Sequence, residues 1–233
     1  MGITKRYNAP VFWPIKRKGK KFTVTPSPGP HSKNLCVPLA ILIRDYLGIA
    51  KNIKEVKTIL SGNNVKVNGK TRKEYKFPVG LMDVIQIGDM FFITLPSKNG
   101  LTFVKTKSPL RLAKVRNKKL LKGGRIQLNL HDGTNLLTKD KEIKTNDVLV
   151  LDLENKIKDV VKFEPGALIM IINGSNAGKF GYIKDLIKRK DCKENIVVIE
   201  INDSLIEVPL SYTFVVGRDK PLIPLKADGE SDE

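Results

Sequence analysis

Cysteine and histidine are scarce in this sequence, and their shortage excludes whole classes of chemistry. The 233 residues contain two of each: Cys36, Cys192, His31 and His131. The cysteines lie far apart along the chain, which suits buried apolar side chains in a reducing cytosol better than a disulfide or a metal pair. Neither histidine has a cysteine or carboxylate at metal-ligand spacing, and nothing suggests a Ser/His/Asp or Cys/His nucleophile. We therefore expect no metal, no cofactor, no catalytic residue and no small-molecule substrate.

Long apolar runs are missing too. No run approaches the roughly 20 residues that a membrane span needs, and the basic N-terminus lacks the apolar region of a signal peptide. We expect a cytoplasmic protein without a membrane partner.

A nucleotide-binding loop is also missing, although GSNAGKFG has its glycines and its lysine. That motif needs four residues between its glycines and a hydroxyl after the lysine. Here Gly174 and Gly178 enclose three residues, and Phe180 replaces the hydroxyl. We reject nucleotide hydrolysis. Asp83 could in isolation be a catalytic acid, but its place at the start of a strand favours a turn or cap role.

Acidic residues are absent from two long windows. None precedes Asp45, and none lies between Asp89 and Asp132. The formal net charge is +18 at pH 7. So large an excess of cations points first to a nucleic acid and second to an anionic membrane surface.

Residues 1–35 have the composition of an extension rather than a domain. Five prolines in this segment forbid long helices, and such a segment alone cannot bury enough surface to offset its conformational entropy. Aromatic residues alternate with cations, which suits stacking on bases and pairing with phosphates. We expect the segment to be flexible in the free protein and ordered on RNA; an inert disordered tail is the alternative. The expected RNA contacts are Lys5, Arg6, Trp13, Lys16, Arg17, Lys18, Lys20, Lys21, His31 and Lys33.

Two helices and a small sheet are predicted for residues 36–87. Apolar residues with helical spacing follow Pro38, which suits a first helical position, and Gly48 ends that helix. A second helix begins at Asn52, with Glu55 three residues later as in a capping box. The spacing then changes to a strand alternation at 65–67, followed by an Asn-Gly turn and a strand at 84–87.

The polar faces of these elements are basic. Their sequences VPLAILIRDYLG, VKTILSGNNVKVNGKTRK and GLMDVIQI resemble the S-four-type RNA-binding module of ribosomal proteins and RNA-modifying enzymes. In that family the helical pair and the turn after the first strand face structured RNA. The resemblance therefore implies RNA contacts by Arg44, Lys51, Lys54, Lys57, Lys70, Arg72 and Lys73.

Short strands separated by Gly, Pro, Asn and Lys continue from residue 90 to about 163 and predict a small barrel or sandwich. The second acid-free window falls here, and we interpret it as another RNA-facing surface. Its expected contacts are Arg111, Lys114, Arg116, Lys118 and Lys119.

Five strands with a late single-turn helix are predicted between residues 164 and 218, as in an SH3-like barrel. The stretch EPGALIMIINGSNAGKFGYIKDLIKR resembles the KOW motif of ribosomal proteins and transcription-elongation factors. Lys179 in its loop is a further expected RNA contact. The residues after 218 form an acidic tail.

The whole order of segments resembles one family, the archaeal and eukaryotic small-subunit ribosomal protein designated four-e. Blocks that carry the resemblance include PSPGPH, KEIKTNDVLVLDLENKIKDVVKFEPG and NGSNAGKFGYI. It implies a structural, non-enzymatic protein of the small ribosomal subunit, bound to 16S-type rRNA and to neighbouring ribosomal proteins. The modest length resembles archaeal rather than eukaryotic members. Two alternatives stay open: an RNA-modifying enzyme with an appended RNA-binding module, and a KOW-type transcription-elongation factor.

The predicted fold class is therefore α+β and mostly β. Its expected parts are a basic extension (1–35), an ααβ RNA-binding module (36–89), a central β domain (90–163), an SH3-like KOW barrel (164–218) and a tail (219–233).

Overall fold

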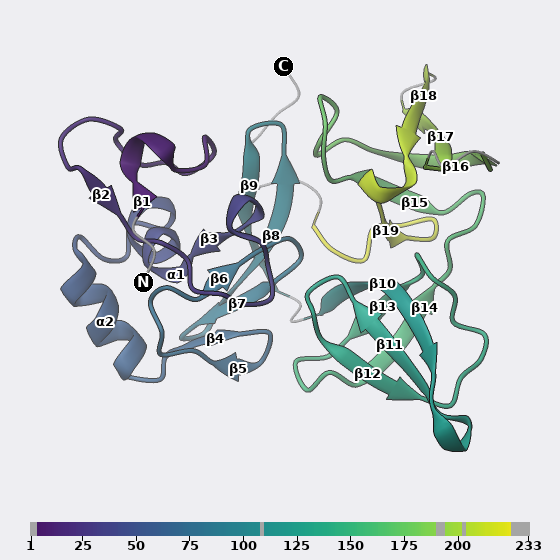
Figure 1. The fold of residues 1–233 in the computed structure, drawn as a ribbon, viewed down its shortest axis with the longest axis horizontal. Coiled ribbons are helices and arrows are strands. Elements are labelled where there is room, and N and C mark those ends of the chain that lie inside the picture. Colours follow the sequence, from purple (N-terminus) through teal and green to yellow (C-terminus); the bar gives the residue numbers. More distant parts are fainter. Residues whose placement is uncertain (1–3, 108–109, 190–193, 202–203, 225–233) are drawn as a thin grey trace. The chain divides into compact units, whose positions relative to one another are not determined.

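The structure, a computed structural model, describes residues 4–107, 110–189, 194–201 and 204–224. It is mostly β with few helices (Figure 1), as the sequence predicts. The chain forms two compact units, one over residues 4–95 and 99–107 and one over 96–98 and 110–224. Cys192, the Asn202-Asp203 turn and the acidic tail from residue 225 lie outside the described residues.

Two short helical segments form one side of the first unit. The α1 helix (Leu39–Ile41) continues as the π-helical turn η3 (Leu42–Tyr46), in which the Leu47 N–H bonds to the Leu42 carbonyl. The expected start is wrong by one residue, because Pro38 is extended and pairs in β3 (Val37–Pro38) with β6 (Pro78–Val79). Gly48 follows with a φ of 65°, a conformation that glycine adopts without strain.

The α2 helix (Ile53–Ser61) begins where the sequence predicts. The Asn52 side chain accepts hydrogen bonds from the N–H groups of Lys54 and Glu55, and Glu55 in turn accepts from the Lys51 N–H at 2.7 Å. Its apolar residues Val56 and Leu60 are buried. Capping and one apolar face therefore fix this helix on the core.

A five-stranded sheet completes the first unit, in the order β5-β4-β7-β8-β9. Its strands are β4 (Val65–Val67), β5 (Lys70–Thr71), β7 (Val84–Ile87), β8 (Met90–Ser97) and β9 (Gly100–Thr106). Asn68 and Gly69 both have positive φ, 50° and 76°, as the predicted two-residue hairpin turn requires. The sheet continues through β8 and β9, beyond the boundary expected near residue 90.

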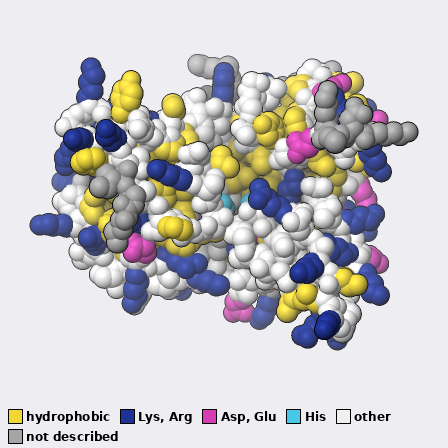
Figure 2. Space-filling view, viewed as in Figure 1, with side chains coloured by type: hydrophobic (Ala, Val, Ile, Leu, Met, Phe, Trp, Pro, Cys, Tyr) yellow, Lys and Arg dark blue, Asp and Glu magenta, His cyan; other side chains and the backbone are white. Residues whose placement is uncertain are grey.

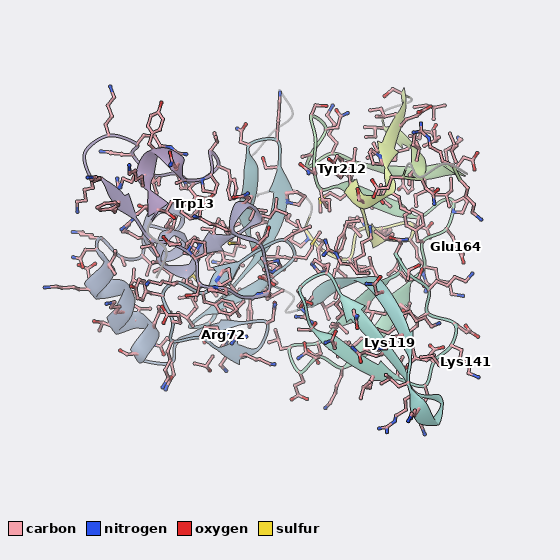
Figure 3. All side chains as sticks on the ribbon, viewed as in Figure 1. Trp13, Arg72, Lys119, Lys141, Glu164 and Tyr212 are labelled. Atoms are coloured by element: carbon pink, nitrogen blue, oxygen red, sulfur yellow. The ribbon has the colours of Figure 1, made fainter. Side chains whose placement is uncertain are left out.

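The N-terminal segment packs into the core of this unit. Its elements are β1 (Thr4–Lys5), η1 (Arg6–Asn8), β2 (Phe22–Thr23) and η2 (Lys33–Leu35). Trp13 is 2% exposed, and its indole N–H donates to the Cys36 carbonyl at 3.0 Å. Ile15 and Val24 join the same hydrophobic cluster. The expectation that Trp13 stacks on RNA is therefore corrected, because its side chain lies in a core supplied partly by later residues (Figure 3).

The second unit contains two antiparallel sheets. The first has the order β12-β11-β10-β13-β14, and the second has the order β18-β17-β16-β15-β19. Their bounds are β10 (Arg111–Leu120), η4 (Lys122–Gly124), β11 (Ile126–Leu130), β12 (Asn135–Thr138), β13 (Val148–Leu151), β14 (Ile157–Val161), β15 (Leu168–Ile171), β16 (Phe180–Ile187), β17 (Ile196–Ile201), β18 (Ser204–Pro209), η5 (Leu210–Tyr212) and β19 (Thr213–Gly217). After residue 164 the described chain has the strands β15 to β19 and the single-turn helix η5.

Lys114 joins the two sheets of this unit. Its ammonium group donates to the carbonyls of Leu210 and Thr213 at 3.3 and 2.8 Å. Next to it, the rings of His131 and Phe214 meet edge to face at 5.4 Å. The contact between the sheets thus includes a buried lysine beside aromatic and apolar side chains.

Candidate nucleic-acid interface

A groove of about 1260 Å³ in the first unit combines two sets of cations that the sequence analysis assigned to RNA. One wall comes from the N-terminal segment between Arg6 and Thr25. The other comes from the end of η3, the start of α2 and Tyr75-Lys76. We call it the basic groove.

Cations surround the basic groove. They are Arg6, Lys16, Lys20, Arg44, Lys51, Lys54 and Lys76. Asp45 is the acidic residue among its described lining residues, and both Asp45 carboxylate oxygens are engaged by Arg44 at 3.0 and 2.6 Å. The remaining cations of the groove are therefore not neutralised by a carboxylate that lines it. The electrostatic potential inside the groove is positive as a result. Figure 2 shows how far Lys and Arg outnumber Asp and Glu on one face of the protein.

Arginines hold the N-terminal wall in shape. Arg6 donates to the carbonyls of Phe22 and Lys16 at 3.3 and 2.8 Å. Arg17 donates to four carbonyls, those of Arg6, Ala9, Pro10 and Val11, at 2.8 to 3.2 Å. The assignment of Arg17 to RNA is therefore corrected, since its donors are used to fold the loop.

Two aromatic residues of the groove were not among the predicted RNA contacts. Phe22 is 49% exposed, with Lys21 Nζ 5.5 Å from its ring centroid. Tyr75 lies beneath Lys57 and Lys76, whose Nζ atoms are 4.8 and 5.5 Å from the ring. Each of these aromatic residues is adjacent to a lysine in the sequence. That pattern could have predicted Phe22, Tyr75 and Lys76 as RNA contacts.

His31 belongs to a buried network and not to the RNA-facing surface. Its Nε2 lies 2.9 Å from the Asp83 carboxylate, and their side chains are 8% and 1% exposed. Asp83 also accepts from the Asn68 amide and the Gly80 N–H. Burial alone would raise the pKa of Asp83, but His31, Gly80 and Asn68 together hold it below its usual value. The predicted turn role of Asp83 is confirmed, and the His31 assignment to phosphate is wrong.

That network anchors the turn between β4 and β5. Asn68 Oδ1 accepts from the Val84 N–H at 2.9 Å, so both ends of the Asn68 side chain are fixed. Lys70 and Lys73 are exposed after the turn. Arg72 lies with its guanidinium 4.3 Å from the Phe77 ring centroid, which fixes its direction.

In the second unit, the structure splits the predicted basic surface in two. Arg111 and Lys114 are buried, and Arg111 pairs with Asp132 at 2.7 Å. Their assignment to RNA is wrong because the first half of β10 lies inside the unit. The second half is exposed and carries Arg116, Lys118 and Lys119 (Figure 3). With Lys122 and Arg125 beyond it, this half forms the basic hairpin.

Lys118 of the basic hairpin is less available to a ligand, since its Nζ donates to the carbonyls of Lys141 and Ile143 at 2.7 and 2.6 Å. The other predicted contacts are exposed outside both surfaces. They are Lys5, Lys18, Lys21, Lys33, Lys57 and Lys179.

Within the described part of the chain, no three His, Cys, Asp or Glu side chains are placed to hold a metal ion. None of the helices seen there is long and apolar enough to cross a membrane.

Comparison with known proteins identifies related sequences along nearly the whole chain. Residues 87–157 match the model described as "Ribosomal family S4e", residues 37–85 match the S4 domain, and residues 4–34 match the RS4NT domain. A relative from Methanosphaera stadtmanae named small ribosomal subunit protein eS4 is 40% identical and covers 96% of this chain and 95% of its own. A relative of the same name from Archaeoglobus fulgidus is 41% identical, covering 95% and 97%.

A solved structure has the same fold. The crystal structure of the 30S ribosomal protein S4e from Thermoplasma acidophilum is 34% identical and superposes with a TM-score of 0.69. The match covers 79% of this chain and 96% of that chain.

Proposed function

The chain belongs to the ribosomal S4e family, and from that premise we propose that it is a structural constituent of the small ribosomal subunit that binds 16S-type rRNA. The observation that carries the proposal is the basic groove, where cations from two separate segments face one space. Lysines and arginines there neutralise phosphates and release counterions, which supplies most of the affinity. The protein binds without turnover, in the cytoplasm, beside other ribosomal proteins.

Further contacts complete the proposed interface. The turn after β4 presents Lys70 and Arg72 in fixed directions, which suits recognition of RNA shape. The basic hairpin presents a second set of cations. The sheet of β15 to β19, with its single-turn helix, is an SH3-like barrel of the KOW type in this proposal, and Lys179 lies before its second strand.

The two alternative functions lose their support. The family is one of structural ribosomal proteins, which sets aside an RNA-modifying enzyme. An elongation factor would share only the C-terminal barrel, whereas the likeness to ribosomal relatives covers almost the entire chain.

Co-sedimentation tests the proposal. The protein should travel with small ribosomal subunits through a sucrose gradient in high magnesium, and it should bind a small-subunit rRNA fragment with an affinity that falls steeply with salt. Replacing Lys16 and Lys51, one from each wall of the groove, by alanine should weaken that binding. A matched control replaces Lys156 and Lys158, which pair with Glu154 and Asp152 at 2.7 and 3.2 Å. Protein that stays at the top of the gradient beside intact subunits contradicts the proposal.

A further inference from the structure

We propose that the basic groove takes an unpaired, unstacked stretch of RNA rather than the outside of a duplex, with Phe22 as the surface on which a base stacks. This inference rests on the proposed function and specifies the kind of RNA that the groove accepts.

The first argument is the chemistry of the groove lining. Beneath the cations lie the apolar side chains of Ile15, Val24 and Ala50, each at most 7% exposed. Pro14 and Ile53 continue this apolar surface. The outside of a duplex offers phosphates and sugars, which bind cations and gain nothing from an apolar floor. An unstacked base has an apolar face that the floor can cover.

The second argument is the exposed ring of Phe22. Phe22 is 49% exposed and lines the groove, so its ring offers an apolar face on which a base can stack. Its position is fixed, because β2 pairs Phe22 with Lys5 and because Arg6 bonds to the Phe22 carbonyl. Tyr75 is less available, since two lysines, Lys57 and Lys76, lie against its ring, whereas one lysine, Lys21, lies 5.5 Å from the ring of Phe22.

The third argument is the placement of charge on both walls. Lys16 and Lys20 come from the N-terminal segment, and Lys51 and Lys54 come from the start of α2. A single strand running between the walls can place phosphates against both pairs while its bases turn to the floor. The volume of about 1260 Å³ exceeds the roughly 300–1,000 Å³ of small-molecule sites, so more than one nucleotide has room.

The test compares two RNA hairpins that differ only in an internal bulge of unpaired nucleotides, by filter binding at several salt concentrations. The full-length protein should prefer the bulged RNA. Phe22→Ala should weaken binding of the bulged RNA by about 5- to 150-fold, the loss expected for one stacked base, without changing the salt slope. Phe22→Trp should retain the affinity. Tyr7→Ala is the matched control, because Tyr7 is 85% exposed and does not line the groove.

The outcomes separate this inference from the proposed function. The inference is overturned if the protein binds both hairpins with equal affinity, or if Phe22→Ala weakens the binding of both hairpins equally. The proposed function survives either result as long as the binding depends on salt. Absence of binding to either hairpin and to the rRNA fragment overturns both. Displacement of the bulged RNA by polyglutamate at equal charge concentration would assign the groove to an acidic protein and overturn the inference. Fluorescence of the buried Trp13 verifies that the two alanine variants are folded, and circular dichroism does so for Phe22→Trp, which carries a second tryptophan.

Discussion

Lys114 is buried, and burial disfavours the charged form of its ammonium group. It is 8% exposed, and its partners are the neutral carbonyls of Leu210 and Thr213. Burial and, to a smaller extent, repulsion by Arg116 lower the pKa of Lys114 to about 8, against an opposing effect of Glu194. The folded protein therefore releases this proton more readily than the unfolded chain does.

This difference predicts a pH dependence. The unfolded chain binds the Lys114 proton up to about pH 10.4, whereas the folded protein loses it near pH 8. Between these values the unfolded chain binds more protons, so this lysine's contribution to the free energy of unfolding rises with pH, by up to about 3 kcal/mol. Denaturant unfolding of the wild type and of Lys114→Met from pH 7 to 10 measures the difference. A difference that stays constant or falls with pH contradicts the prediction.

Leu42 tests the packing of the first unit. Its side chain is completely buried at the junction of α1 and η3. Leu42→Ala should lower the free energy of unfolding of that unit by about 2–5 kcal/mol, since it removes apolar contacts and leaves a cavity. Leu35→Ala is the matched control, because Leu35 is 64% exposed. Equal effects of the two substitutions would show that the buried face of the helix is assigned wrongly.

At this scale the sequence predicts charge but not what the charge touches. Arg17, Arg111 and Lys114 were assigned to RNA because each lies in an acid-free window. In the structure their partners are carbonyls or Asp132, brought close by the fold. No local pattern distinguishes such a cation from one that faces solvent.

Among the elements, α2 and the turn at Asn68-Gly69 were predictable because their determinants are local. A cap, an apolar face and two residues with positive φ all lie within a few positions of one another. The β10 strand has no comparable local signal, since RLAKVRNKKL has a buried first half and an exposed second half and never alternates regularly. Its pairing with β11 and β13, which lie elsewhere in the chain, decides its conformation.

The exposed half of β10 gives a prediction about the basic hairpin. The variant Lys119→Ala, Lys122→Ala, Arg125→Ala should weaken binding of all RNA sequences about equally, because phosphate contacts carry no sequence information. The slope of log affinity against log salt should fall by up to about one unit for each phosphate that is no longer neutralised. Filter binding measures both quantities. Lys118 is left in place because it holds the carbonyls of Lys141 and Ile143. An unchanged slope would exclude the hairpin from the interface.

The N-terminal segment gives a prediction about order in the free protein. The sequence contains a single tryptophan, and Trp13 is 2% exposed with its N–H bonded to the Cys36 carbonyl. Its emission without RNA should therefore be that of a buried indole, resistant to acrylamide quenching, and should shift to the red on unfolding. Emission typical of a solvated indole that turns blue only when RNA is added would restore the hypothesis of a segment ordered by RNA.

On the scale of the whole molecule, composition alone pointed to nucleic acid, and the family agrees with it. A net charge of +18 predicts that the partner is negatively charged, but it does not predict the shape of the surface that binds this partner. The basic groove could not be predicted, because its two walls come from segments that are separate in the sequence and meet only through tertiary packing. The sequence supplied the cations of both walls, and the fold decided which of them face each other.

The contacts of the N-terminal segment also set an order of events during synthesis. Residues 4–35 bond to residues made later: Trp13 to Cys36, Ser27 to Lys76 and His31 to Asp83. At about 5–20 residues per second, the growing chain carries this segment for several seconds before its partners exist. In that interval its apolar side chains lack the core that later residues supply, although the carbonyls that Arg6 and Arg17 bind are already present within the segment. The segment can therefore take its folded form only after the chain has been synthesised as far as Asp83.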